Sequence, residues 1–432
     1  MTSQGVVGER IKTIRRQRGL SQAQLAHPEL SDSYVSLIES GKRTPTPAVL
    51  ELLAQKLDCS LTYLVNGVTA EQMEELEVGL RFARLALENG DLTEARRRFA
   101  ELIEDKSLSG LPSLRQEAQY GYALASEACG DLPEAISTLN VLRESDGDSQ
   151  TPEQRIKIGI ALCRCYREIG DFEAAVRVGE DMTSVATASP VWNDDLIELG
   201  STLLSVYIVR GDLLRARQFA GELLAAAEAL GTPRAIVAAC WNAALTAEEV
   251  GSGEEAMTLI ERALAVQSEN GEPRNLARLR SAYAKVQLRV RPAEALAVRD
   301  LSTRALEELK ASAAGTTSIA TCELNIAKAE MILGHPDEAA DHAQTALDLA
   351  EAGTSDTVLA SAQLVVSQVR WLQRRDEESL ADLAKAEASL QRLPATRRTA
   401  EAWQTAAETF GQLGEDEKSV AAYQRALDCV GL

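Results

Sequence analysis

Apolar side chains recur every three or four residues along most of the chain, which is the spacing of one face of an α-helix. In residues 7–18, for example, Val7, Ile11 and Ile14 fall on one face. Alanine and leucine supply most of the apolar content and favour helix, whereas aromatic residues, which favour strand, make up only 4% of the 432 residues. The pattern therefore predicts an all-α protein. At this length more than one domain or a repeat array is expected.

Residues 1–68 divide into five short helices. The first covers residues 7–18 and ends at Gly19, the second covers 22–26, and the third covers 32–40. A fourth opens at Thr46-Pro47 and a fifth holds Leu61 and Leu64. Ser21 and Ser31 stand where N-caps of the second and third helices are needed. Five helices in about 60 residues, with a tight second-to-third junction, are typical of a helix-turn-helix domain.

The remaining chain repeats with a period of about 40 residues. The phrase Gly-Asp-x-x-Glu-Ala, or a close variant, starts at Gly90, Gly130, Gly170, Gly211, Gly251 and Gly334, and weaker copies start at Val290, Arg374 and Gly414. These nine phrases predict nine helical hairpins, each with a turn at the phrase. The Asp after the glycine is expected to cap the second helix of the hairpin.

Two further landmarks keep the same period. Prolines lie 22 residues after the turn glycine at Pro112, Pro152, Pro233 and Pro273, and Pro190 lies 20 after its own, so each is expected to open the next helix. Mostly small residues stand seven positions before and five positions after each turn, as in the pairs Ala83/Ala95, Cys163/Ala175 and Ser367/Ser379. Small residues at both positions let the two helices of a hairpin approach closely.

With these three landmarks, residues 69–432 resemble an array of tetratricopeptide repeats with longer helices than usual. The resemblance implies a right-handed solenoid whose first helices form a concave, ligand-binding face. Asn242 and Asn325 occupy a slot that often holds a peptide backbone in such arrays, and Trp241 adjoins the first of them. Three positions further along stand cations that can hold a carboxylate: Arg84, Arg164, Lys285 and Lys328. The alternative is that all these are ordinary polar positions on a wetted surface.

The phrases GLSQAQLA (19–26) and SYVSLIESGKRTP (33–45) closely resemble the Cro/CI-type (XRE) helix-turn-helix family, and the resemblance covers residues 7–66. It implies that the third helix enters the major groove. Base edges would face Asp32, Ser33 and Ser36, and Tyr34 would touch the backbone or a thymine methyl. Phosphates would be held by Gln22, Lys42, Arg43 and Thr44, and by one of Arg15 and Arg16. Asp32 could accept from cytosine N4 or instead only cap its own helix.

Charge confines any DNA contact to the first 68 residues. The net charge of the chain is −20, but residues 1–68 carry a net +2, so the rest carries −22. Such an acidic body repels nucleic acid as a whole. The acidic residues also have a plainer role, as solvated helix faces that keep a long array soluble.

Other classes of function find no support in the sequence. No apolar run approaches the 18 residues of a membrane helix, and the N-terminus lacks the apolar core of a signal peptide. The seven cysteines include no CxxC pair, which fits a reducing cytoplasm. No phosphate-binding loop, nucleophile elbow or metal-ligand motif occurs, so we expect no enzyme, no cofactor and no metal site.

In domain order and repeat style the chain resembles the bacterial peptide-sensing (quorum-sensing) regulators of the Rgg, PlcR and PrgX type. This implies a cytoplasmic, sequence-specific transcription factor, a homodimer joined through the solenoid that reads an inverted-repeat operator in double-stranded DNA. A peptide or small molecule on the concave face would change the spacing of the two heads. The alternative is a protein-docking scaffold that is anchored to DNA and takes no small ligand.

Overall fold

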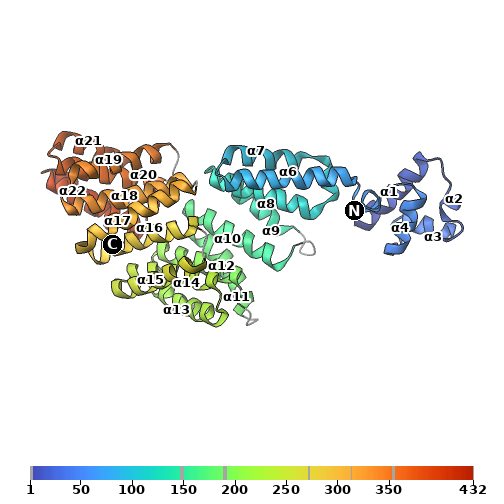
Figure 1. Ribbon diagram of the computed structural model, residues 1–432, viewed down its shortest axis with the longest axis horizontal. Helices are drawn as coiled ribbons and strands as arrows, with labels where there is room; N and C mark the ends of the chain where they lie inside the picture. The colour runs from blue at the N-terminus through green and yellow to red at the C-terminus, as the bar shows by residue number, and fades with distance from the viewer. Residues whose placement is uncertain are drawn as a thin grey trace. The chain divides into compact units, whose positions relative to one another are not determined.

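The computed structural model describes residues 3–145, 150–187, 192–270, 273–312, 314–352 and 356–431. Throughout these ranges the regular elements are helices, and no strand occurs, as the spacing of apolar residues predicted. The chain divides into two compact units, Met1–Gln150 and Thr151–Leu432, which we describe separately (Figure 1). The first unit holds the five-helix head and two hairpins, and the second holds seven hairpins.

The head, drawn in dark blue in Figure 1, consists of five helices packed around one apolar core. They are α1 (Ser3–Gln17), α2 (Gln22–Ala26), α3 (Asp32–Glu39), α4 (Pro47–Lys56) and α5 (Leu61–Asn66). Ile11, Leu25, Val35, Ile38 and Leu53 are all buried in this core. The second and third helices are capped as the sequence predicted, since the hydroxyl oxygens of Ser21 and Ser31 accept from backbone N–H groups in the first turns of α2 and α3.

Two hairpins complete the first unit. They are α6 (Ala70–Glu88) with α7 (Leu92–Glu104), and α8 (Pro112–Ala128) with α9 (Leu132–Glu144), and the short 3-10 helix η1 (Lys106–Gly110) joins them. Phe99 of α7 is fully buried where α8 carries Gly121. A Cβ at Gly121 would come within 2.3 Å of the Phe99 ring, so the glycine makes room for the large side chain.

Seven hairpins make up the second unit. They are α10 (Pro152–Glu168) with α11 (Phe172–Thr187), α12 (Asp194–Arg210) with α13 (Leu213–Leu230), α14 (Pro233–Glu249) with α15 (Gly253–Asn270), α16 (Pro273–Val290) with α17 (Ala295–Ala311), α18 (Thr316–Leu333) with α19 (Pro336–Glu351), α20 (Asp356–Leu372) with α21 (Asp376–Leu390), and α22 (Arg397–Gln412) with α23 (Asp416–Cys429). Pro112, Pro152, Pro233 and Pro273 each open a helix, as predicted. Pro190 lies outside the described residues.

The first helices of successive hairpins in this unit pack on one another. The row curves back on itself, because α22 also contacts α12, five hairpins earlier. Close to the same place, a Cβ added to Gly170 would lie 3.2 Å from the Cβ of Pro394. The inner side of this curve, which we call the interior, therefore brings first helices from distant repeats near one another.

The turns follow the predicted period, including the two that lack glycine. Glycine takes the left-handed conformation at seven of the predicted turns, with φ between +77° and +88°. Arg374 adopts the same conformation at φ +63°, although it carries a Cβ. At the Val290 phrase the chain instead forms the 3-10 helix η2 (Pro292–Glu294), and the α16–α17 hairpin still forms.

The small residues meet across each hairpin, as their spacing predicted. Cys163 and Ala175 are fully buried, with the Cys163 Sγ 3.3 Å from the Ala175 carbonyl oxygen. Ser367 and Ser379 each donate a hydroxyl hydrogen bond to the other's carbonyl oxygen. The capping prediction was wrong for Asp91, Asp131 and Asp212, which stand at the N-cap but make no side-chain cap bond. Among these aspartates Asp171 does cap, since its Oδ1 accepts from Ala174 N at 3.0 Å.

Candidate functional site

The α3 helix of the head presents a polar face to solvent. Val35 and Ile38 turn inward and are each only 1% exposed. Asp32, Ser33 and Ser36 lie exposed on the outer side. This is the face that a recognition helix needs free, because base edges are read by short polar side chains at its N-terminal end.

The turn before α3 is held in place by Lys56 at the end of α4. Its Nζ donates to the carbonyl oxygens of His27 at 2.6 Å and Ala26 at 3.2 Å, and pairs with Glu29 at 2.5 Å. Because the Lys56 ammonium contacts two carbonyl oxygens and one carboxylate, it fixes the short turn and therefore the position at which α3 begins. The alternative that Asp32 caps α3 is wrong, because Ser31 occupies the N-cap.

Cations flank this face on the loop that follows α3. Lys42, Arg43 and Thr44 are exposed. The guanidinium of Arg43 lies over the ring of Tyr34, 5.3 Å from its centroid, and Tyr34 itself is half-buried against the head core. A cation placed beside the polar face can bind phosphate without choosing a sequence, which fits the role that the resemblance implied for these residues.

Of the two arginines of which one was predicted to hold a phosphate, Arg15 is not free for that role. Its Nε and Nη2 donate to the two carboxylate oxygens of Glu39 at 2.6 and 2.9 Å, and its Nη1 donates to the Leu20 carbonyl at 2.7 Å. The side chain is buried, so Arg15 holds α1 to α3 and has no fork left for a phosphate. Arg16 is the exposed member of the pair. Gln22 also donates to Glu39, from Nε2 at 2.9 Å, which places its side chain at the junction of α2 and α3.

The electrostatics of the Glu39 site are those of a structural ion pair. Burial alone would raise the pKa of Glu39, but hydrogen bonds from Arg15 and Gln22 and the charge of Arg15 outweigh it and hold that pKa below its ordinary value. Glu39 is therefore an anion throughout the neutral range. Sequence analysis did not single out Glu39, because a carboxylate on α3 carries no sign of which helix it will meet.

In the second unit, Asn242 and Asn325 use their amide groups inside the fold. The Nδ2 of Asn325 donates to both the carbonyl oxygen and the Oγ of Ser281, at 3.0 and 3.2 Å, and the residue is buried between α16 and α18. The Nδ2 of Asn242 donates to Ala238 O in its own helix at 3.1 Å. Trp241 packs against the core around α14 and α15. The N–H groups of Asn325 are thus a clamp between two helices, which removes the basis for its predicted peptide contact.

Charged residues from four first helices meet in the interior, and we call this set the interior cluster. It consists of Glu248, Glu249, Lys285, Arg289, Lys328, Arg397, Arg398 and Glu401. Arg289 pairs with Glu248 at 3.0 Å and with Glu401, 112 residues further along the chain, at 3.4 Å. Two predicted cations lie elsewhere: Arg84 on α6 is exposed and pairs with Glu117, and Arg164 is half-buried on α10.

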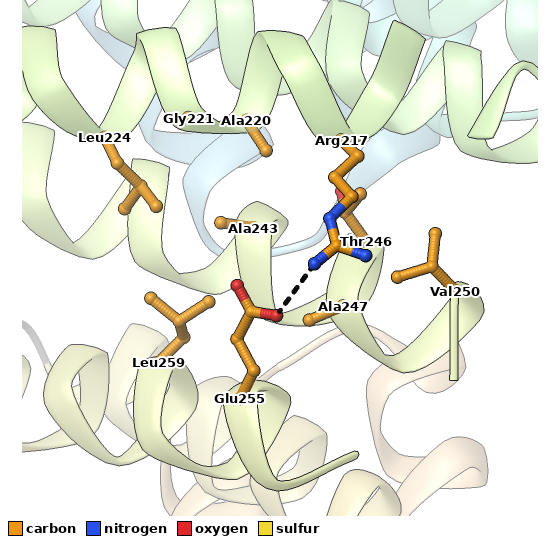
Figure 2. A pocket seen from close by; sticks show the side chains of 10 residues that line it. All are labelled: Arg217, Ala220, Gly221, Leu224, Ala243, Thr246, Ala247, Val250, Glu255 and Leu259. Carbon is orange, nitrogen blue, oxygen red and sulfur yellow. Dashed lines mark ion pairs between the residues drawn. The ribbon is translucent and has the colours of Figure 1, made fainter. Parts of the chain in front are cut away.

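Two hollows among the described residues contain none of the predicted ligand residues. The one shown in Figure 2 lies between α13, α14 and α15 and has a volume of about 120 Å³. Arg217 and Glu255 form an ion pair across it at 3.8 Å. This volume is well below the roughly 300–1,000 Å³ of small-molecule sites. The other, of about 540 Å³, lies in the first unit and is lined by residues 59–72 from α5 and α6.

Comparison with known proteins places the head in a family. The helix-turn-helix family model matches residues 11–64, and a tetratricopeptide repeat model matches residues 400–428. The chain is 34% identical over 116 residues to the immunity repressor protein of Bacillus phage phi105, covering 26% of this chain and 76% of the repressor. It is 38% identical over 67 residues to the HTH-type transcriptional regulator y4dJ of Sinorhizobium fredii, covering 15% of this chain and 87% of that protein.

The chain therefore belongs to the Cro/CI-type (XRE) helix-turn-helix family, as a DNA-binding transcriptional regulator with tetratricopeptide repeats, and not to a class of enzymes. Among solved structures, a Rap protein complexed with Competence and Sporulation Factor superposes with a TM-score of 0.53 at 15% identity, covering 83% of this chain and 98% of that one. This likeness shows the solenoid fold. In the described ranges, none of the helices has the length and apolar content needed to span a bilayer.

Proposed function

We propose that the chain is a cytoplasmic transcription factor that reads a specific operator with α3 and senses an effector in its solenoid. The observation that carries the first half is the arrangement of the head, with Asp32, Ser33 and Ser36 exposed on one side of α3 and Lys42 and Arg43 exposed on the loop behind it. Such a division separates residues that choose a sequence from residues that hold phosphate.

The operator is proposed to be an inverted repeat bound by a homodimer. A head this small covers only a few base pairs, and two heads related by a two-fold axis read half-sites about one helical turn apart. We place the dimer contact in the solenoid, residues 69–432, which leaves the head, residues 1–68, free to bind DNA. The tetratricopeptide fold, shared with the Rap protein that binds Competence and Sporulation Factor, supports a sensing role for the interior.

Selection of bound duplexes from a random-sequence pool by the full chain tests this proposal. The expected result is one enriched motif with two inverted half-sites, together with a dimeric mass in solution. A pool that remains random after several rounds would contradict sequence-specific reading. It would favour the alternative, a docking scaffold that binds DNA through phosphate contacts alone.

A further inference from the structure

The interior cluster contains two lysines that the fold places side by side. The Asn325–Ser281 hydrogen bonds fix the register between α18 and α16. Lys328 lies three residues after Asn325, and Lys285 lies four residues after Ser281. Residues three or four apart share a helix face, so both lysines stand one turn beyond the clamp, on the sides that face each other.

Neither lysine forms an ion pair with a carboxylate among the described residues, although the charges of Glu248 and Glu249 act on Lys285 and oppose the lowering of its pKa. Among the described residues, no hydrogen bond or ion pair reaches Lys285 or Lys328. The nearby carboxylates are taken by arginines: Glu248 and Glu401 by Arg289, and Glu249 by Arg397 at 3.3 Å and Arg398 at 4.0 Å. The cluster thus holds five cations against three carboxylates, in a chain whose net charge is −20.

The surroundings make this excess of positive charge unfavourable. The Lys328 side chain is open to solvent, but it lies inside the curve of the solenoid with protein around it. The resulting partial desolvation, and the neighbouring charges of Lys285 and Arg289, lower the pKa of Lys328 to about 8. Desolvation and the charge of Arg398 also lower the pKa of Lys285.

We propose that Lys285 and Lys328, with Arg289 and Arg398 beside them, bind an oxyanion, the carboxylate or phosphate group of the effector. This rests on the sensing role proposed above and gives it a chemical class of ligand. Each ammonium offers three N–H donors that no described residue accepts from, and a guanidinium offers two parallel N–H groups that match two oxygens. An oxyanion between α16 and α18 would neutralise the excess charge.

A purely structural role for the cluster accounts for the arginines but not for the lysines. Arg289 joins α14 to α22, and Arg397 joins α22 to α14, so both hold the curve closed. The ion pairs of Glu249 lack aligned hydrogen bonds, since its Oε2 is buried without one. An anion bound at the lysines would compete with Glu401 for Arg289 and with Glu249 for Arg398, and this links the proposed site to the curvature of the solenoid.

The test follows the lysines of the full chain by NMR, through the ¹³Cε resonances of biosynthetically ¹³C-labelled lysine, which leaves every ammonium unmodified. The chain has ten lysines, and the resonance missing in Lys328→Gln assigns Lys328. Its midpoint is expected near pH 8. Inorganic phosphate and succinate serve as probes, with sodium chloride at matched ionic strength as control. A nearby opposite charge raises such a midpoint by about one pH unit or more. If only phosphate raises the midpoint of Lys328, the effector group is a phosphate. If only succinate raises it, the effector group is a carboxylate.

A matched variant separates binding from general screening. Lys285→Gln should reduce the rise seen at Lys328, whereas Lys418→Gln, an exposed lysine on α23 paired with Glu415, should leave it unchanged. A midpoint that neither probe moves would overturn the oxyanion site, even if an effector is later found to change DNA binding. A midpoint that moves while the same anion leaves DNA affinity unchanged would support the site and contradict its role in sensing.

Discussion

Arg15 of α1 and Glu39 of α3 form a buried, bidentate ion pair, with Nε–Oε1 and Nη2–Oε2 distances of 2.6 and 2.9 Å. The α3 helix is therefore held to α1 by a largely buried contact. Because removal of one partner leaves a buried charge unpaired, Arg15→Met should cost about 3–5 kcal/mol. Calorimetry of the full chain measures this. Glu9→Gln, which breaks the exposed Lys12–Glu9 pair, is the control and should cost less than about 1 kcal/mol. Equal losses of stability in the two variants would show that burial adds nothing to the contribution of the Arg15–Glu39 pair.

The same pair predicts how the head responds to acid. The folded pKa of Glu39 is lowered from its ordinary value, so the unfolded chain takes up its proton first as the pH falls. The contribution of Glu39 to stability is then complete above the ordinary carboxyl pKa of about 4.3 and declines as the pH falls through the lowered folded value. Unfolding of the wild type and of Glu39→Gln between pH 3 and 7 measures this, and the stability gap between them should narrow toward the acid end. A gap that is constant with pH would contradict the ionised pair.

The asparagine clamp predicts unequal effects of two similar substitutions. Asn325→Ala removes both hydrogen bonds to Ser281 and leaves its buried hydroxyl without this donor, which should cost about 1–3 kcal/mol. Asn242→Ala removes one bond to its own helix and should cost less than about 1 kcal/mol. The shift in the melting temperature of the second unit compares them. If Asn242→Ala proved the more damaging, the clamp would not hold α16 to α18.

The turn at Arg374 predicts a stabilising substitution. A side chain in the left-handed conformation costs roughly 1–2 kcal/mol that glycine avoids, so Arg374→Gly should raise the stability by about 1 kcal/mol. Gly334→Ala imposes the same conformation on a side chain at φ +82°, where nothing else obstructs a Cβ, and should lower the stability by a similar amount. Thermal unfolding of both variants measures whether each substitution raises or lowers the stability. A loss of stability in Arg374→Gly would mean that the arginine side chain makes a stabilising contact.

The position of Lys328 beside Lys285 predicts that the stability of the folded chain rises with pH. The charged groups facing Lys328 are Lys285 and Arg289 of α16. Since the folded pKa of Lys328 is about 8, against about 10.4 for a free lysine, the unfolded chain binds the extra proton between these values. The penalty of Lys328 is then full below pH 8 and is relieved above it. Lys328→Gln should melt higher than the wild type at pH 7, and the difference should shrink toward pH 10. A variant that melts lower at pH 7 would contradict the penalty.

Local spacing in the sequence was enough to predict the hairpins, because each depends on residues close along the chain. The Ser367–Ser379 and Cys163–Ala175 pairs lie only 12 residues apart, and a 40-residue period brings them together in every unit. Even Arg374 keeps the turn, since the packing of the two helices on either side outweighs one strained residue.

The sites were harder to predict because they depend on rotations that accumulate over many residues. Whether Asn325 faces the interior or a neighbouring helix depends on how α18 turns about its own axis, and a period does not reveal that. The Arg289–Glu401 pair spans 112 residues and exists only because the solenoid curves back on itself. Likewise, Arg15 and Arg16 are adjacent in sequence, and only packing against Glu39 separates the buried one from the exposed one.

Phosphate and base contacts by the head should respond differently to substitution. Lys42→Ala with Arg43→Ala removes two cations that we propose bind phosphate and not base edges, so affinity should fall for every duplex and the slope of log affinity against log salt should flatten by about 1–2. Lys418→Ala, far along the chain on α23, controls for the loss of charge alone. A salt slope unchanged in the double variant would exclude the loop after α3 from the phosphate contacts.

The most direct measurement is the operator preference of Ser33→Ala with Ser36→Ala compared with that of the wild type, both as full chains and both selected from the same random duplex pool. Reading by α3 predicts that the enriched motif of the variant changes at one or two positions in each half-site, while its salt slope stays that of the wild type. An identical motif from both proteins would contradict a recognition role for this face of α3.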